Sequence, residues 1–196
     1  MIKIATDSSA DLLAPIAQEL GISVVPLYVR FGDDIYRERV SINDEEFYQK
    51  LVHGTVYPVT IQPGPQDFVE VYQRLSEEAD AIVSIHLSSK LSGTFNSALQ
   101  AKDMLSNSCH IEVVDSQTIT LALGLMTIAA AEAANAGESL QQVLAVVKEA
   151  MHDTHSLVLL DTLKYLQMGG RIGKAKALLG SVLHVKPLIS IKKMVK

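Results

Sequence analysis

Residues 81–100 of this chain read AIVSIHLSSKLSGTFNSALQ. An apolar run of strand length ends at Leu87, a loop rich in hydroxyl groups follows, and a helix is expected to begin near Thr94. In an open α/β sheet, ligands bind beyond the carboxyl ends of the strands. The stretch therefore predicts a central strand of such a sheet, with a candidate ligand loop at its end.

The same alternation of short apolar runs and helical spacing extends in both directions from this stretch. Further expected strands are Ile2–Ala5, Ser23–Val29, Ile111–Val114 and Leu157–Leu160. Start signals favour the helices between them, because Ser139 precedes one apolar-periodic segment and Ser41 with Asp44 resembles a capping box. This alternation predicts an α/β fold, a mainly parallel sheet flanked by helices. We expect an N-terminal α/β domain over residues 1–153 and a partial second α/β domain over residues 154–196.

Composition places the chain among soluble globular proteins. Of its 196 residues, 48% are hydrophobic and 20% are charged, and no apolar run reaches the length of a membrane span. The first residues, MIKIATD, read as a strand and not as a secretory signal. The single cysteine, Cys109, cannot form an internal disulfide, which fits a cytoplasmic location.

Charge is distributed unevenly along the chain. Residues 161–196 contain eight Lys or Arg and one acid, whereas the preceding 160 residues contain nine basic and 21 acidic side chains. The basic end is either a solvated face or a surface that meets an anionic partner. Aromatic residues are only 5% of the chain and do not interleave the basic positions, so nucleic acid is not the expected partner.

Hydroxyl-rich loops follow three of the expected strands. They are Thr6–Asp11, Ser88–Thr94 and Asp115–Thr118. Helix capping explains each loop taken alone. In Ser92-Gly93-Thr94, however, glycine permits close backbone approach, and the helix that follows directs free N–H groups to the same place. That combination suits a carboxylate of single charge, whose apolar body could contact Ile61 and the Leu121–Met126 stretch.

Other chemistries were weighed for the same residues. A nucleophilic Ser92 would indicate a hydrolase, but no G-x-S-x-G elbow surrounds it. Asp7 and Asp115 could hold Mg²⁺, although helix capping is the simpler role for both. A small-anion or phosphate-binding enzyme on the same fold is the main alternative to a binding protein. In Gly169-Gly170-Arg171, Arg171 is either a contact for a phosphate or partner, or a surface side chain beyond a capped helix.

Four motifs, in order along the chain, resemble the DegV family. They are Thr6-Asp7-Ser8-Ser9-Ala10-Asp11-Leu12, Thr60-Ile61-Gln62-Pro63, Ser88–Ala98 and Leu163–Gly173. The resemblance implies a fatty-acid-binding protein of two α/β domains, without catalysis or cofactor, that holds the ligand carboxylate between the domains. It assigns carboxylate binding to Thr60 and Ser92, beside Gly93 and Thr94. It also implies that the bound long-chain acid is passed to a separate fatty acid kinase for phospholipid synthesis.

The chain departs from the family pattern at two points. Ile61 stands where the family usually has a second hydroxyl residue, so one hydrogen bond to the head group is expected to be lost, at a cost of about 1 kcal/mol. Family members also continue well past the strand that matches Lys186–Ile189. We therefore expect the second domain to be truncated.

Overall fold

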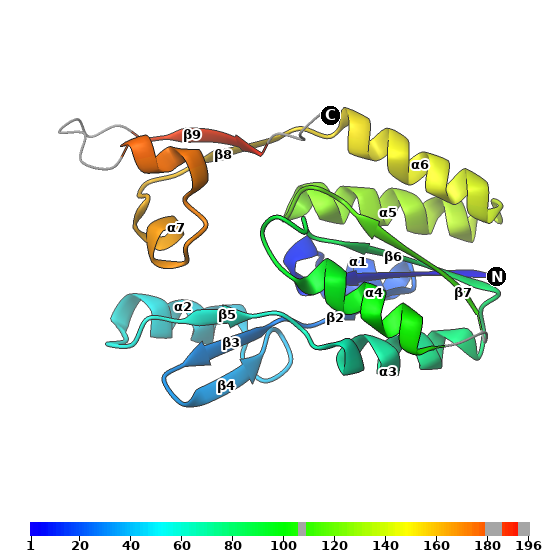
Figure 1. Ribbon diagram of the computed structural model, residues 1–196, viewed down its shortest axis with the longest axis horizontal. Coiled ribbons are helices and arrows are strands. Elements are labelled where there is room, and N and C mark those ends of the chain that lie inside the picture. Colours follow the sequence, from blue (N-terminus) through cyan, green and yellow to red (C-terminus); the bar gives the residue numbers. More distant parts are fainter. Residues whose placement is uncertain (106–108, 179–185, 192–196) are drawn as a thin grey trace. The chain divides into compact units, whose positions relative to one another are not determined.

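The computed structural model describes residues 1–105, 109–178 and 186–191 (Figure 1). The chain forms two compact units, Met1–Thr154 and His155–Lys196. The strands of the first unit are β1 (Ile2–Asp7), β2 (Ile22–Val25), β3 (Tyr28–Phe31), β4 (Asp34–Arg37), β5 (Val59–Ile61), β6 (Ala81–His86) and β7 (His110–Asp115). Its helices are the 3₁₀ turn η1 (Ser8–Ala10) and α1 (Ala14–Glu19), α2 (Asp44–His53), α3 (Pro65–Ser76), α4 (Thr94–Met104), α5 (Leu121–Asn135) and α6 (Leu140–Asp153).

A parallel sheet of four strands forms the centre of the first unit, in the order β2-β1-β6-β7. Strand β1 pairs with β6 from Ile2 opposite Ala81 to Thr6 opposite Ile85. Every residue of β6 is buried, as expected for a parallel strand that is covered on both faces. The predicted α/β fold with a mainly parallel sheet flanked by helices is thus confirmed.

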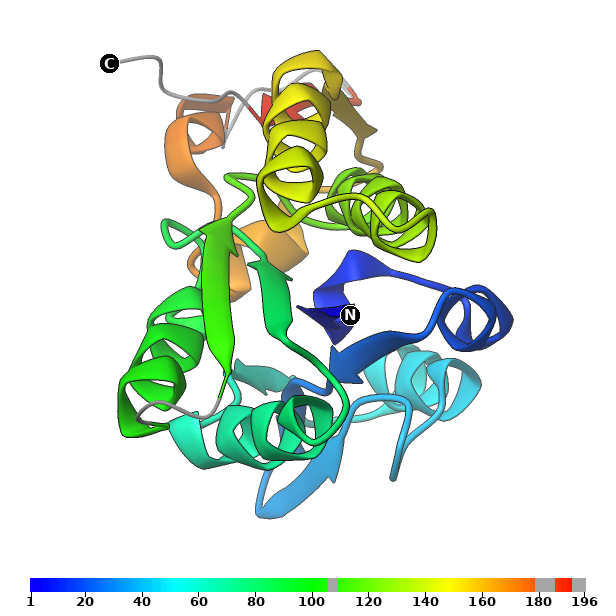
Figure 2. The same ribbon diagram turned by 90° about the vertical axis from the view of Figure 1, so that its right-hand side faces the viewer.

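Helices cover both faces of this sheet, and alternate residues of each strand point to opposite layers. Figures 1 and 2 show α5 and α6 on one face and α3 and α4 on the other. On the first face, Val83 of β6 packs in one core cluster with Leu123 of α5 and Val143 of α6. On the second, Ile82 packs with Phe68 and other residues of α3 and α4. The carboxyl ends of the strands are left as the edge where the hydroxyl-rich loops emerge.

A second sheet, antiparallel and in the order β4-β3-β5, was not predicted from the sequence. The expected single strand Ser23–Val29 is in fact two strands in two sheets, because the chain leaves the parallel sheet after Val25. Pro26 lies at this break, and proline has no N–H to donate to a central ladder. A small core of Val29, Phe31 and Ile42 holds the antiparallel sheet together, with Phe47 of α2 packed against it.

Helix caps agree with the sequence at one predicted start and not at another. Ser139 caps α6, and its hydroxyl accepts a hydrogen bond from the Gln142 amide. The capping box before α2 is formed by Asn43 and Glu46, so the predicted start at Ser41 with Asp44 was wrong. Asn43 satisfies the geometry because its side chain reaches the N3 amide while Glu46 bonds back to the Asn43 amide.

The second unit contains β8 (Ser156–Leu159), α7 (Lys164–Met168), the 3₁₀ helix η2 (Gly173–Leu178) and β9 (Leu188–Ile191). Strands β8 and β9 pair in an antiparallel ladder, with Leu159 opposite Leu188. Strand β9 overlaps the expected strand at Lys186–Ile189, and residues 179–185 and 192–196 lie outside the described part of the chain. That residues 154–196 form a truncated domain stays a prediction. No helix in the described part of the chain is long and apolar enough to cross a membrane.

Candidate functional site

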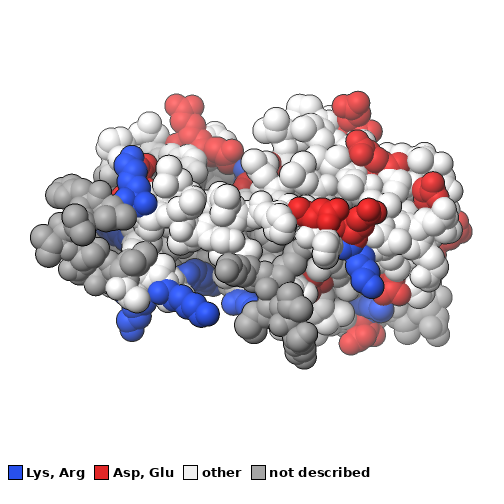
Figure 3. Space-filling view, turned by 90° about the horizontal axis from the view of Figure 1, so that it is seen from above, with Lys and Arg blue, Asp and Glu red and all other residues white. Residues whose placement is uncertain are grey.

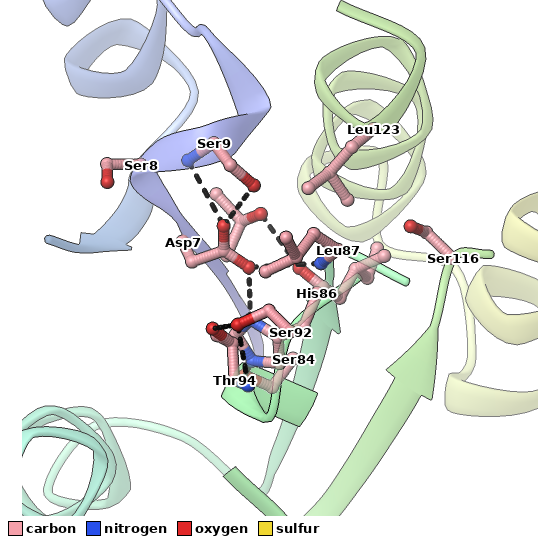
Figure 4. A network of polar contacts seen from close by, with 12 residues as sticks. Asp7, Ser8, Ser9, Ser84, His86, Leu87, Ser92, Thr94, Ser116 and Leu123 are labelled. Atoms are coloured by element: carbon pink, nitrogen blue, oxygen red, sulfur yellow. Dashed lines mark hydrogen bonds and ion pairs between the residues drawn. The ribbon is translucent and has the colours of Figure 1, made fainter. Parts of the chain in front are cut away.

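Two carboxylates at strand ends, those of Asp7 and Asp115, organise the hydroxyl-rich loops, and Figure 4 shows the contacts of Asp7. Asp7, the last residue of β1, accepts hydrogen bonds from the Ser9 amide at 3.1 Å, the Ser9 hydroxyl at 2.5 Å and the Leu87 amide at 3.1 Å. Asp115, the last residue of β7, accepts from the Ser89 amide at 3.2 Å and the Ser89 hydroxyl at 2.6 Å. The loops after β1, β6 and β7 are therefore tied together at one edge of the sheet.

These contacts bear on the magnesium hypothesis for Asp7 and Asp115. The oxygens of both carboxylates already accept hydrogen bonds from loop amides and hydroxyls. Over residues 1–105, 109–178 and 186–191, no cluster of three or more His, Cys, Asp or Glu could hold a metal ion. Asp7 does cap the turn η1, as predicted, whereas Asp115 holds the Ser89 loop and the Gln117 amide and does not cap the following helix, α5.

Ser92 lies two residues before the first residue of α4 and is paired with Thr94. Its oxygen accepts from the Thr94 amide at 3.2 Å and lies 2.9 Å from the Thr94 hydroxyl. When the Thr94 hydroxyl donates across that contact, both lone pairs of the Ser92 oxygen are occupied and its own O–H can point to a ligand. Thr94 is fully buried and Ser92 is half-buried, so Ser92 is the member of the pair that a ligand can reach.

The segment that contains Thr60 meets this helix start through Gln62. A Cβ atom added to Gly93 would lie 2.3 Å from the Gln62 Oε1 atom, so the glycine makes room for the Gln62 amide. The Gln62 amide nitrogen also donates to the Ser97 hydroxyl at 3.3 Å. Thr60 lies two residues before Gln62, on strand β5, and its side chain is exposed. The two predicted head-group motifs are therefore neighbours in the structure.

Thr60 also lines a cavity of about 300 Å³ between the antiparallel sheet, α2 and the strand-end loops. Most of the cavity's exposed wall is apolar, and the volume is at the lower end of the range for small-molecule sites. Ser92, Gly93 and Thr94 are not among the lining residues. The wall is made by Ser9, Asp11, Leu27, Tyr28, Val29, Glu38, Arg39, Ile42, Asn43, Asp44, Phe47, Tyr48, Thr60, Ile119 and Thr120.

The charged groups in this wall are largely compensated. Arg39 contacts the Asp11 carboxylate at 3.2 Å and the Asp44 carboxylate at 3.3 Å. Burial raises the pKa of the Glu38 carboxyl, which accepts a hydrogen bond from the Ser8 hydroxyl at 2.5 Å. Burial likewise raises the pKa of the Asp11 carboxyl, although the Arg39 charge opposes the shift. A ligand in the cavity therefore meets apolar side chains and hydroxyls, and the guanidinium already has two acidic partners.

A fully buried chain of polar groups lies beneath the loops. The Tyr72 hydroxyl donates to the Ser84 hydroxyl at 2.8 Å, Ser84 contacts the His86 Nε2 atom at 2.7 Å, and His86 Nδ1 lies 3.0 Å from the Asp7 carboxylate. All four side chains have 0% exposure. Both ring nitrogens of His86 thus have a partner inside the core, and the sequence did not predict these partners.

Arg171 belongs to the second unit, where it follows the end of α7. Gly169 caps that helix, Gly170 has a φ of +73°, and the exposed Arg171 donates to the Gly169 carbonyl at 2.6 Å. This is the capped-helix arrangement that was one of the two interpretations, and a role in phosphate or partner binding stays a prediction. Figure 3 shows Lys and Arg side chains on the second unit and Asp and Glu side chains over helices of the first. Described charges of the second unit are Asp161, Lys164, Arg171, Lys174, Lys176 and Lys186.

Sequence reasoning missed most of the cavity. Its wall combines Tyr28, Glu38 and Phe47 with loop residues that are distant in the sequence, such as Thr120. The signal that could have found it is the break at Pro26, which starts a second sheet and so creates a concave surface beside the strand ends.

Comparison with known proteins gives a consistent result along the entire chain. A family model described as "Uncharacterised protein, DegV family COG1307" matches residues 1–196. A DegV domain-containing protein of Deinococcus radiodurans is 37% identical over 191 residues, which cover 97% of this chain and 67% of that protein. The corresponding protein of Caldanaerobacter subterraneus subsp. tengcongensis is 36% identical over 189 residues, 96% of this chain and 67% of that protein.

Solved structures agree with the fold. A fatty-acid-binding DegV family protein from Thermus thermophilus has a TM-score of 0.89 and 41% identity, over 97% of this chain and 68% of that one. DegV of Bacillus subtilis, a fatty acid binding protein, has a TM-score of 0.86 and 34% identity, over 96% of this chain and 67% of that one. A stearic-acid-binding protein from Eubacterium ventriosum has a TM-score of 0.90 and 30% identity, over 98% of this chain and 67% of that one.

This chain spans about two thirds of the length of the relatives that it matches. The matching family model, the sequence identity and the shared fold lead to one conclusion: the chain belongs to the DegV family.

Proposed function

We propose that this chain binds a long-chain fatty acid, with the carboxylate held by the hydroxyl groups of Thr60 and Ser92. The observation that carries the proposal is the exposed Thr60 hydroxyl on the wall of a largely apolar cavity. Gln62 packs over Gly93, which brings the Thr60 segment beside the Ser92 hydroxyl. Hydroxyl donors without an unpaired cation suit a ligand with one negative charge and an apolar body.

The relatives support this assignment. The proteins from Thermus thermophilus and Bacillus subtilis are described as binding fatty acid, and the one from Eubacterium ventriosum as binding stearic acid. Each buried methylene contributes about 0.8 kcal/mol, so an acyl chain of ordinary length would supply most of the affinity. Charge-assisted hydrogen bonds from hydroxyls add about 1.5–3 kcal/mol each and orient the head group. The cavity beside Thr60 is the proposed place for part of the tail.

We propose further that the chain has no catalytic activity of its own. Ser84, His86 and Asp7 have the order of contacts of a hydrolase triad, but all three are fully buried, so a substrate has no access to Ser84. The hydrogen-bond partner of Ser92 is Thr94, which is not a base. These contacts favour a binding protein over the alternative of a small-anion or phosphate-binding enzyme.

Delivery of the bound acid to a separate fatty acid kinase is part of the same proposal, as the family resemblance implies. We place the protein in the cytoplasm, where the thiol of Cys109, which donates to the Ala79 carbonyl at 3.3 Å, would stay reduced. The handover would be detected as ATP-dependent formation of acyl phosphate only when chain, acid and kinase are all present. Product formation at an equal rate without the chain would contradict it.

Mass spectrometry of organic extracts from the purified, denatured protein tests the binding proposal. We expect a stoichiometric long-chain fatty acid in the wild-type extract and little in that of Thr60→Val with Ser92→Ala. Thr55→Val with Ser76→Ala is the matched control, because it removes one Thr and one Ser hydroxyl outside the cavity and the Ser92 loop. Equal acid retention by the double variant and the control would refute the head-group assignment.

A further inference from the structure

In the buried chain Tyr72–Ser84–His86–Asp7, the direction of the two contacts made by His86 depends on which ring nitrogen carries a proton. The Asp7 oxygen that faces Nδ1 also accepts from the Leu87 amide, so a proton on His86 Nδ1 gives that oxygen a second hydrogen bond. The His86 Nε2 atom then accepts from the Ser84 hydroxyl, whose oxygen accepts in turn from Tyr72. With these directions each contact of the chain has one donor and one acceptor, and His86 carries a proton on Nδ1. The His86 ring also packs edge-on against Phe68, with ring centroids 5.0 Å apart, which fixes its plane.

Asp7 is the point where this chain meets the ligand loops. Besides His86, its carboxylate accepts from the Ser9 amide, the Ser9 hydroxyl and the Leu87 amide. Four donors occupy the acceptor sites of the carboxylate, so its orientation is fully specified (Figure 4). A rotation of Asp7 would break hydrogen bonds to two loops at once.

Both loops held by Asp7 lead to the candidate site. Ser9 lines the cavity, and its carbonyl accepts from the amide of Thr120, another lining residue, at 2.8 Å. Leu87 directly precedes the loop that ends at Ser92. The orientation of one buried carboxylate thus sets both the cavity wall and the path of the chain toward the head-group hydroxyl.

We propose that His86 is a positioning residue of the fatty acid site, which acts by orienting the Asp7 carboxylate and through it the Ser9 and Leu87 loops. This inference rests on the proposed function for the identity of the ligand. His86 does not line the cavity and is fully buried, so its contribution is indirect. Apolar side chains would fill the same space, and a buried polar chain is stabilising only when every member is satisfied. Its purpose here is to fix a loop geometry that apolar packing would leave unspecified.

The test compares three variants of the full 196-residue chain. His86→Phe keeps the ring but loses the donor to Asp7, whereas His86→Asn places an amide nitrogen where Nδ1 was. Val147→Ala is the control for lost stability alone, because Val147 is a buried apolar residue of α6 and is not part of the hydrogen-bonded chain. Amide hydrogen exchange at Ser9 and Leu87 is measured without ligand, and affinity is measured by titration with cis-parinaric acid.

Relative to Val147→Ala, we expect His86→Phe to speed exchange at Ser9 and Leu87 at least tenfold and to weaken cis-parinaric acid binding at least tenfold. His86→Asn should restore both to within about threefold of wild type. If His86→Phe does not fold, His86→Gln replaces it, since the longer amide extends toward Ser84 and not toward Asp7. Long-range ¹H–¹⁵N spectra of the wild type should show the proton of His86 on Nδ1.

Three results would overturn the proposal: a wild-type His86 without a proton on Nδ1, exchange at Ser9 and Leu87 in His86→Phe no faster than in the control, or faster exchange without a loss of affinity. If wild type does not bind cis-parinaric acid, the proposed function fails. The exchange comparison then still decides whether His86 holds the loops. Faster exchange together with unchanged affinity would show that the loops are held but that the fatty acid site does not depend on them, which also refutes the inference.

Discussion

Replacement of Gly124 by alanine would create a packing clash and would also raise the helix propensity of α5, and these two effects on stability have opposite signs. Gly124 lies on the buried side of α5, and an added Cβ would be 2.5 Å from the Ala10 carbonyl oxygen and 3.2 Å from the Leu12 Cδ2 atom. Atoms of this kind do not approach within 3.0 Å, so the helix and the turn after β1 must separate by roughly half an ångström. The obstacle is backbone, which cannot rotate away as a side chain would.

Overpacking of this kind costs about 1–3 kcal/mol, whereas alanine in place of glycine in a helix gains at most about 1 kcal/mol. We therefore expect Gly124→Ala to lower the free energy of unfolding by about 1–2 kcal/mol, measured by urea denaturation followed by circular dichroism. Ala129→Gly in the same helix measures the propensity contribution separately, because Ala129 is not among the residues packed in the core cluster. A Gly124→Ala variant as stable as wild type would show that the close approach of α5 to Ala10 is not a constraint, and the reasoning would fail.

Three further outcomes follow from contacts described above. Tyr72→Phe and Ser84→Ala should each lower the free energy of unfolding by about 1–2 kcal/mol, because each leaves a buried polar partner unsatisfied. Their effects should be less than additive in urea denaturation, and strict additivity would mean that the hydrogen bond contributes nothing. Gly93→Ala should displace the Gln62 amide and cost about 1 kcal/mol, visible as a shift of its side-chain NMR signal. An unmoved Gln62 signal would contradict this. Burial raises the pKa of Glu38, so the unfolded state loses this proton at a lower pH than the folded state does. The free energy of unfolding therefore falls as pH rises from the unfolded-state pKa to the folded-state pKa of Glu38. Glu38→Gln should remove this fall in melting temperature between acidic and neutral pH, and a parallel pH profile would refute it.

The central sheet was predictable because its signals are local. A parallel strand that is buried on both faces has a largely apolar sequence, as β6 has, and β1 and β7 are short Ile- and Val-containing segments interrupted by Lys3 and by Glu112. The starts of α3 at Pro65, α4 at Thr94 and α6 after Ser139 are similarly marked by residues within one turn of the helix. For these elements the tertiary structure does not compete with the local preference.

The antiparallel sheet and the cavity could not be predicted in the same way. Ser23–Val29 is mostly apolar on both sides of Pro26, so periodicity alone does not distinguish one strand from two strands in different sheets. The choice of Asn43 over Ser41 as a cap depends on a tertiary turn, in which the Ser41 hydroxyl is already bonded to the Arg37 amide. Thr60 was identified through its family resemblance, since three residues of an edge strand carry no local sign that they face a cavity formed by distant segments.

The position of β1 in the sheet has a consequence for how the chain folds. Strand β1 lies between β2 and β6, and the register places Ile2 opposite Ala81. Contacts between residues this far apart form slowly, because a long loop must close before they contribute. During synthesis at ordinary rates, about 4–16 s separate the appearance of the two strands. For that time the apolar residues of β1 lack one of their two neighbours, and this interval is when the nascent chain is most open to aggregation or to the binding of a chaperone.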